Sequence, residues 1–80
     1  MRLTVLIRPK AGILDPQGDA VQGSLAHLGF AVSAVRVGRL VVLEVPAMDE
    51  VAARGEVQRM CAELLANPLI ESFEIVTGPT

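Results

Sequence analysis

The sequence has almost no aromatic residues. Phe30 and Phe73 are the only two, and tryptophan and tyrosine are absent. The aromatic platforms on which proteins stack unpaired nucleotide bases are therefore missing. Lysine and arginine never occur in a run, and the formal net charge is -2, so the basic footprint that nucleic acid requires is missing as well. Both absences argue against nucleic-acid binding.

The sequence is also poor in cysteine and in long apolar runs. Cys61 is the only cysteine, which excludes an internal disulfide and fits a reducing compartment, so we expect a cytoplasmic protein. Near the amino terminus, residues 3–7 form an apolar stretch of only five residues before Arg8. This stretch is too short for a signal-peptide core or a membrane span. We therefore expect no membrane association.

Aliphatic side chains, in contrast, are abundant. Hydrophobic residues make up 51% of the 80 residues and charged residues 20%. A chain of this length forms one small domain, residues 1–80, whose core cannot hold all of this apolar material, so we expect contact with another protein. Residues 1–40 hold five basic and two acidic residues, and residues 41–80 hold two and seven. This asymmetry suits docking on a complementary partner, although ordinary solvated charge is the simpler interpretation.

The first half of the chain predicts a strand followed by a helix. Residues 2–8 alternate with period two, as a strand with one buried face does, and the apolar positions are Leu3, Val5 and Ile7. Asp15 is a favourable helix N-cap, and Pro16 suits the first helical turn because its missing N–H is not needed there. Apolar residues then recur at helical spacing: Ala20, Val21, Leu25 and Leu28. Gly29 supplies the left-handed residue that ends this helix.

The middle of the chain predicts a β-hairpin. Residues 30–37 and 40–46 both read as strands, and Gly38 with Arg39 offers a tight turn between them. We therefore expect these two strands to be antiparallel neighbours.

The last third predicts a second helix and a final strand. Asp49 caps the helix, and Asn67-Pro68 stops it. Its apolar positions are Val57, Met60, Cys61, Leu64 and Leu65. Residues 69–76 form the final strand, which we expect to end at Gly78-Pro79 because proline cannot continue a ladder.

These elements predict an α+β fold of order β-α-β-β-α-β. This is the ferredoxin-like arrangement, with two helices on one face of an antiparallel sheet. Apolar residues occur at both parities of the strands: Leu6 with Val5, Val32 with Val35, Val41 with Val42, and Ile75 with Val76. Because both faces of the sheet then require burial, we expect the protein to form a homo-oligomer through the sheet.

No residue pattern indicates catalysis, cofactor binding or a metal site. His27 is the only histidine and has no second ligand nearby in the sequence, while Cys61 lies in an apolar helical stripe. Asp15 is better explained as a cap than as a general base. Gly12 and Gly18 lack the Gly-Lys-Ser/Thr ending of a phosphate-binding loop.

Four basic residues require a separate interpretation: Arg8, Lys10, Arg36 and Arg39. In this topology they could converge on an anion or on a partner's carboxylate. Their spacing is not specific, and solvated charge or pairing within the fold is the simpler explanation.

The segment Gly-Ile-Leu-Asp-Pro-Gln-Gly at residues 12–18 resembles the PurS family, the small subunit of bacterial and archaeal phosphoribosylformylglycinamidine (FGAM) synthase. The similarity continues through Leu28-Gly29, the Val-Arg-Val-Gly-Arg segment at 35–39 and the Asn-Pro-Leu-Ile-Glu segment at 67–71. Arg39 stands where the family usually has lysine, and Pro9 stands at a usual strand position.

The resemblance implies a role in purine synthesis. Such subunits form dimers that bridge a glutaminase subunit, which releases ammonia, and a large synthetase subunit, which uses ATP and Mg²⁺ to amidate formylglycinamide ribonucleotide. By this resemblance the chain carries no active site and no cofactor, and it forms a homodimer or tetramer that joins both partners. The residues of the family motifs that we expect at subunit contacts are Lys10, Gly12, Leu14, Asp15, Pro16, Gln17, Gly18, Arg36, Gly38, Arg39, Asn67 and Pro68.

Two other interpretations of the sequence stay open. One is a ferredoxin-like regulatory module that binds a small ligand at a dimer interface. The other is a small acyl-phosphate hydrolase of the same fold, supported only by Arg8 beside a glycine-containing loop. This second interpretation lacks an amide to position water, because Asn67 is the sole asparagine and already stops a helix.

Overall fold

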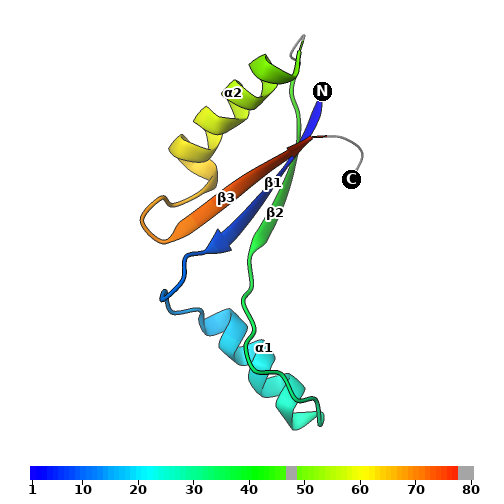
Figure 1. Cartoon of the computed structure of the whole chain (residues 1–80), viewed down its shortest axis with the longest axis vertical. Helices are drawn as coiled ribbons and strands as arrows, with labels where there is room; N and C mark the ends of the chain where they lie inside the picture. Colours follow the sequence, from blue (N-terminus) through cyan, green and yellow to red (C-terminus); the bar gives the residue numbers. More distant parts are fainter. Residues whose placement is uncertain (47–48, 78–80) are drawn as a thin grey trace.

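Strand β1 (Arg2–Pro9) is the centre of a three-stranded antiparallel sheet (Figure 1). The computed structural model describes residues 1–46 and 49–77. Strands β2 (Arg39–Glu44) and β3 (Glu71–Thr77) flank β1 in the order β2-β1-β3. In the register, Val5 lies opposite Val41 of β2 and Ile75 of β3, so these side chains share one face of the sheet. This face is the buried one.

Helix α2 (Glu50–Met60) covers that face, packing on β1 and β3, and continues into the π-helical turn η1 (Cys61–Leu65). Asp49 caps α2 by accepting the N–H of Ala52 at 2.7 Å, as predicted. The buried apolar residues are Leu3, Val5, Ile7, Val45, Ala53, Val57, Cys61 and Ala66. The core is therefore small, as expected for 80 residues.

Leu64 is an exception to the predicted apolar stripe of this helix. Its side chain is 83% exposed, whereas Val57 and Cys61 are fully buried. A π-helical turn is wider than an α-helical turn, so the residues within it rotate away from the face set by α2. The predicted end of the helix at Asn67-Pro68 is confirmed, because Ala66 already has extended backbone. The predicted strand stop at Gly78-Pro79 lies outside the described residues.

Helix α1 (Pro16–His27) extends away from the sheet instead of covering it (Figure 1). Gly29, with a φ of +96°, reverses the chain as predicted, and Phe30 N–H donates to the Leu25 carbonyl at 3.0 Å. The returning segment runs back beside the helix, where Gln22 Nε2 donates to the Val32 carbonyl at 3.0 Å. We call α1 together with residues 28–34 the arm.

The predicted ferredoxin-like order is therefore wrong, and the observed order is β-α-β-α-β. Residues 30–37 form no strand, and the chain does not make a hairpin at Gly38 and Arg39. Extended residues become a strand only when they run beside a neighbour that offers hydrogen bonds, and the backbone of residues 30–37 bonds to Gln22 and Asp15 instead of to the free edge of β2. Residues 30–37 instead follow α1 away from the sheet. Of the two predicted covering helices, only α2 packs on it.

The arm makes the molecule elongated. Its radius of gyration is 15.7 Å, compared with about 12 Å for a compact domain of this length. None of the apolar residues expected to bury α1 is buried: Ala20, Val21, Leu25 and Leu28. Residues 20–35 contain no lysine, arginine, aspartate or glutamate. Beyond Asp19 the arm is therefore a projection without charged side chains and without a hydrophobic core of its own.

The second face of the sheet was predicted to be apolar, and it carries an aliphatic patch bordered by charged residues, with Arg2 opposite Glu44 and Leu6 opposite Glu74. Leu6 of β1 lies opposite Leu40 of β2, and Thr4 lies opposite Val42 of β2 and Val76 of β3. Leu40 and Val42 are 61% and 50% exposed. The four aliphatic side chains of this open face are Leu6, Leu40, Val42 and Val76. Among the described residues, no helix is both long and apolar enough to cross a membrane.

Candidate functional site

The arm joins the sheet through two adjacent segments, residues 10–18 and residues 35–39, which we call the elbow. Ten of the twelve family-motif residues belong to these segments: Lys10, Gly12, Leu14, Asp15, Pro16, Gln17, Gly18, Arg36, Gly38 and Arg39. The two segments are more than a dozen residues apart in the sequence, but side-chain and backbone contacts hold them together.

Asp15 ties the start of α1 to the returning segment. Its Oδ1 accepts the N–H of Gly18 at 2.9 Å, which confirms the predicted N-cap, and Pro16 occupies the first helical turn. Its Oδ2 accepts the N–H of Val37 at 2.8 Å. The hydrogen bond from Val37, then that from Gly18, and also the charge of Arg36 hold the pKa of Asp15 below its usual range. The ionised carboxylate is thus a structural acceptor and is unsuited to act as a general base.

Arg36, in the segment of residues 35–39, binds the segment of residues 10–18 through its guanidinium group. Its Nη1 donates to the Ile13 carbonyl at 3.0 Å, and its Nη2 donates to the Lys10 carbonyl at 2.9 Å. Both carbonyls belong to the loop that contains Gly12. A single guanidinium group therefore fixes the shape of this loop.

Two glycines allow the segments to approach each other closely. A Cβ atom at Gly18 would lie 2.4 Å from the Val35 carbonyl oxygen, and one at Gly38 would lie 2.2 Å from the Ile7 carbonyl oxygen. Both neighbours are backbone atoms that cannot move aside without shifting a chain segment. The absence of a side chain at these two positions is thus a steric requirement of the elbow.

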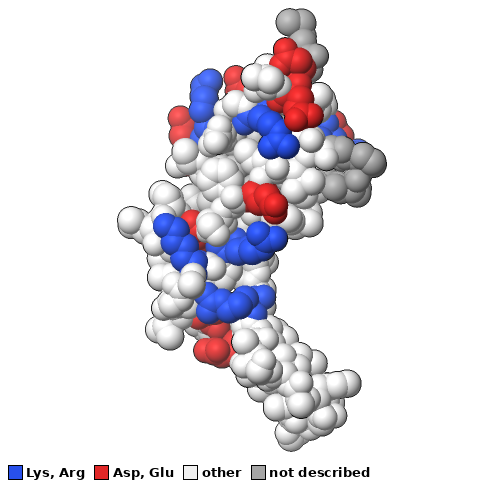
Figure 2. All heavy atoms as spheres, viewed as in Figure 1, with Lys and Arg blue, Asp and Glu red and all other residues white. Residues whose placement is uncertain are grey.

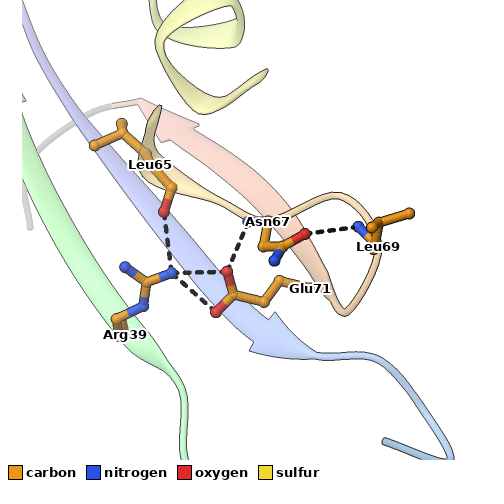
Figure 3. Close-up of polar contacts among 5 residues, drawn as sticks. All are labelled: Arg39, Leu65, Asn67, Leu69 and Glu71. Atoms are coloured by element: carbon orange, nitrogen blue, oxygen red, sulfur yellow. Dashed lines mark hydrogen bonds and ion pairs between the residues drawn. The ribbon is translucent and has the colours of Figure 1, made fainter. Parts of the chain in front are cut away.

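Arg39 links the elbow to the end of the second helix (Figure 3). Its Nη2 donates to the Leu65 carbonyl at 3.0 Å and to the carboxylate of Glu71 at 2.8 and 2.9 Å. The same carboxylate accepts the N–H of Asn67 at 2.8 Å, and Lys10 Nζ donates to the Pro68 carbonyl at 2.6 Å. Asn67 and Pro68, the remaining two motif residues, are thereby attached to the elbow.

Glu71 is a residue that the sequence reasoning did not select. The hydrogen bond from Asn67 N–H, then that from Arg39, hold the pKa of Glu71 below its usual range. Arg39 and Glu71 stand on opposite sides of β1, 32 residues apart in the sequence. No local spacing could have paired them, and the glutamate of the Asn-Pro-Leu-Ile-Glu segment was the only available signal.

Several predicted residues lie apart from these contacts. Leu14 is 87% exposed, and Gln17 is also exposed. His27 lies on the surface of α1, whereas Cys61 is buried in the core, and this burial raises the pKa of its thiol. Within the described ranges, no three His, Cys, Asp or Glu side chains gather as a possible metal site. The contacts of the elbow therefore position the arm relative to the sheet.

A concave surface of about 440 Å³ lies at the elbow, and we call it the elbow pocket. Its lining residues are Leu6, Ile7, Arg8, Pro9, Arg36, Gly38, Arg39 and Leu40. Three of the four basic residues singled out from the sequence thus meet here, while Lys10 reaches toward Pro68 instead. Figure 2 shows lysine and arginine side chains gathered over the middle of the molecule, above an arm whose far end is uncharged.

Comparison with known proteins agrees with this architecture. Residues 2–78 match the family model of PurS, described as phosphoribosylformylglycinamidine (FGAM) synthase. The chain is 44% identical over 73 residues to the phosphoribosylformylglycinamidine synthase subunit PurS of Synechocystis, covering 90% of this chain and 71% of that protein.

Solved structures share the three-stranded fold. Thermus thermophilus PurS is 42% identical with a TM-score of 0.81, covering 98% of this chain and 96% of that chain. A chain in the structure of PurLQS from Thermotoga maritima is 29% identical with a TM-score of 0.86, covering 94% and 93%. The motif at residues 12–18, the elbow that it builds and these similarities over nearly the whole length establish that the chain belongs to the PurS family.

Proposed function

We propose that this chain is a non-catalytic accessory subunit of FGAM synthase in purine biosynthesis. In this role it bridges a glutaminase subunit and a synthetase subunit during the ATP-dependent conversion of formylglycinamide ribonucleotide and glutamine to FGAM and glutamate. The observation that carries the proposal is the arm, which is uncharged beyond Asp19 and which the elbow holds away from the sheet. A side-chain surface of this kind has no use inside an isolated monomer, but it suits contact with other chains.

Family membership supports the same role. The solved structure of PurLQS from Thermotoga maritima contains a chain with this fold. We propose that the present chain likewise joins PurL-like and PurQ-like subunits, and that ATP and Mg²⁺ act only on the synthetase subunit. We also propose that the chain is a homodimer or tetramer, because the open face of the sheet and the arm both leave aliphatic side chains uncovered.

The chemistry of ammonia explains why a bridge would be needed. Ammonia released into neutral water is mostly protonated and then lacks the lone pair that attacks the activated amide. A wall built from aliphatic side chains excludes water without offering a proton donor. We propose that this chain contributes to such shielding, or to the docking that creates it, and that it does not react itself.

Reconstitution with the two partner subunits tests the proposal. Formation of FGAM from glutamine should require this chain, whereas formation from added ammonium salt should depend on it much less. Unchanged glutamine-dependent activity without the chain would contradict a bridging role. A ligand-induced rise in the melting temperature of the isolated chain would instead favour the regulatory module. That interpretation assumed a ferredoxin-like fold, which this chain does not have.

A further inference from the structure

The outer edge of strand β2 carries backbone groups that no strand uses. Met1 and Val45 form two backbone hydrogen bonds with each other, at 2.7 and 2.8 Å, so every second residue back from Val45 directs its backbone toward β1. The intervening residues, Leu40, Val42 and Glu44, therefore direct their N–H and C=O groups away from β1. In the described part of the chain, no strand pairs with this side of β2. An exposed edge of this kind is a template for strand addition.

The same chain carries an extended segment that has no strand partner either. Residues 34–38 continue directly into β2 (Figure 1). The Val37 N–H and the Val35 carbonyl face the start of α1. By strand alternation, the backbone groups of Ala34 and Arg36 point to the other side, which is the side of the free edge of β2. No backbone hydrogen bond of these two residues occurs among those of the described chain.

This segment is not able to fold back onto the edge of its own β2. A two-residue hairpin loop requires a positive φ, and no described residue after Gly29 has one. Gly38 lies against the Ile7 carbonyl, and the Asp15 carboxylate holds the N–H of Val37 in the elbow. The segment and the edge therefore both stay unpaired in an isolated chain.

A second copy of the chain supplies what each edge lacks. The segment and β2 form one continuous stretch, so two such stretches can lie antiparallel about a two-fold axis near Gly38. The segment of each copy then pairs with β2 of the other, and both free edges are used at once. A partner of a different kind would need two separate segments to achieve the same result.

The side chains of the two stretches agree with this register. Ala34 would lie opposite Val42 on the open face, and Val35 would lie opposite Val41 on the face that α2 covers. Apolar residues thus meet apolar residues on both faces, and no like charges are opposed. Gly38 would meet Gly38 of the second copy on the axis, where the two chains cross without side chains between them.

We propose that two copies of this chain exchange their arms, each adding residues 34–38 as a further strand beside β2 of the other. The exchange also carries α1 onto the second copy, where α2 packs on β1 and β3 and leaves Val41 and Leu43 of β2 only partly buried. Each sheet thereby regains the β-α-β-β-α-β layout expected from the sequence, with one strand and one helix supplied by the other copy. This inference rests on the proposed homo-oligomer and names the segments that form it.

Paired cysteines test the register. Opposed residues of a hydrogen-bonded antiparallel pair have Cα atoms about 5.5 Å apart, which suits a disulfide. The full chain with Ala34→Cys and Val42→Cys should therefore form a covalent dimer on mild oxidation. Mixing isotopically labelled and unlabelled copies beforehand should yield hybrid linked peptides in mass spectrometry. Ala34→Cys with Ser72→Cys is the control and should stay unlinked, because the exposed Ser72 lies on β3, beyond β1 from β2.

Hydrogen exchange in the unaltered oligomer provides a second measurement. The Val42 N–H points to the free edge, so it should exchange at least about 100-fold more slowly than an unpaired amide if a segment of the second copy covers it. The Val41 N–H points to β1 and should be protected in any case, which makes it the internal control.

Three results would overturn arm exchange. They are a disulfide between two Val42→Cys single variants, which would show that two β2 strands pair directly, a disulfide between residues 34 and 42 of one copy, and an unprotected Val42 amide in the oligomer. If light scattering finds only monomers of the unaltered chain, the proposed homo-oligomer fails together with this inference. If the chain is an oligomer but the double variant stays unlinked, only the arm exchange fails.

Discussion

The carboxylate of Asp15 accepts the backbone N–H of Val37 at 2.8 Å, across 22 residues of sequence. The other oxygen of the same carboxylate caps α1 through Gly18. One side chain therefore starts the helix and also attaches the returning segment to it. This double role distinguishes Asp15 from Asp49, whose carboxylate caps α2 through Ala52.

Replacing Asp15 by alanine should therefore disturb more than a helix cap. We expect Asp15→Ala to lower the melting temperature by about 5 °C or more, because a lost cap alone has an effect of this size in a small domain. Hydrogen exchange at the Val37 amide should accelerate strongly in Asp15→Ala and stay unchanged in Asp49→Ala. Equal protection of Val37 in both variants would show that the 2.8 Å contact does not hold the elbow.

Gly38 should not tolerate a side chain. In Gly38→Ala the new Cβ would lie 2.2 Å from the Ile7 carbonyl oxygen, so β1 and the returning segment must separate. We expect a loss of about 1–3 kcal/mol in the free energy of unfolding, measured by urea denaturation. Gly23→Ala is the control, since nothing lies within 4 Å of a Cβ there and its position is inside α1. That variant should be about 0.5–1 kcal/mol more stable than the unaltered chain.

The pair formed by Arg39 and Glu71 should make stability depend on pH. Because the pKa of Glu71 is lowered in the folded state, the unfolded chain binds a proton more readily than the folded one. The stabilisation is complete above about pH 4.3, the ordinary glutamate value, and is lost as the pH falls through the lowered pKa.

Glu71→Gln should consequently be less stable than the unaltered chain at pH 7, and the difference should shrink by about pH 3. Urea denaturation at both pH values measures it. Glu56→Gln serves as the control, because the exposed pair of Glu56 with Arg59 at 3.5 Å contributes little at either pH. A constant deficit of Glu71→Gln across the pH range would argue against a role for its charge.

Cys61 should be protected from thiol reagents in the folded protein. Its side chain is fully buried, and burial raises the pKa of the thiol, so little thiolate forms near neutral pH. Labelling by a chromogenic disulfide should therefore be slow in buffer and fast in urea. Labelling at the rate of a free thiol in buffer would show that the core around η1 opens.

The open face of the sheet should control self-association. Val42→Glu places a charge on this face, where the valine is 50% exposed, and we expect light scattering to report a smaller assembly for the isolated chain. Val51→Glu is the control on α2, where the valine is 82% exposed and lies away from the open face. If light scattering gave identical masses for both variants, the open face would not be the surface of self-association, and the arm would be the remaining candidate.

Local signals in the sequence predicted the elements of this fold well wherever a residue acts on its own neighbours. Asp15 with Pro16, and Asp49, mark the two helix starts, and Gly29 marks the end of α1. These predictions succeeded because caps and left-handed residues satisfy backbone groups only a few residues away.

The sequence-based predictions failed where the structure depends on which other segment of the chain a strand or helix packs against. Val35 and Val37 alternate as in a strand, but alternation indicates only an extended chain and does not say which neighbour offers hydrogen bonds. For the same reason, the apolar residues of α1 gave no sign that the helix would leave the sheet. Residues 30–37 leave the edge of β2 unpaired, and their backbone bonds to Gln22 and Asp15 instead.

The residues of the candidate site show the same difference between local signals and long-range contacts. The segment at residues 12–18 was sufficient to indicate the family, and its aspartate and proline were sufficient to place a helix start. Only the folded chain brings Arg36 to the carbonyls of Lys10 and Ile13, and Arg39 to Glu71. These contacts join residues 23 to 32 positions apart, so no periodicity records them.

The sequence by itself thus determined the local geometry of this protein: where the helices start and which face of β1 is apolar. Only the tertiary structure decided that the first helix becomes an arm, that the sheet has three strands and that three arginines border one pocket. The physical reason is that caps, turns and alternation depend on nearest neighbours, whereas strand pairing and charge placement depend on segments that meet only after folding.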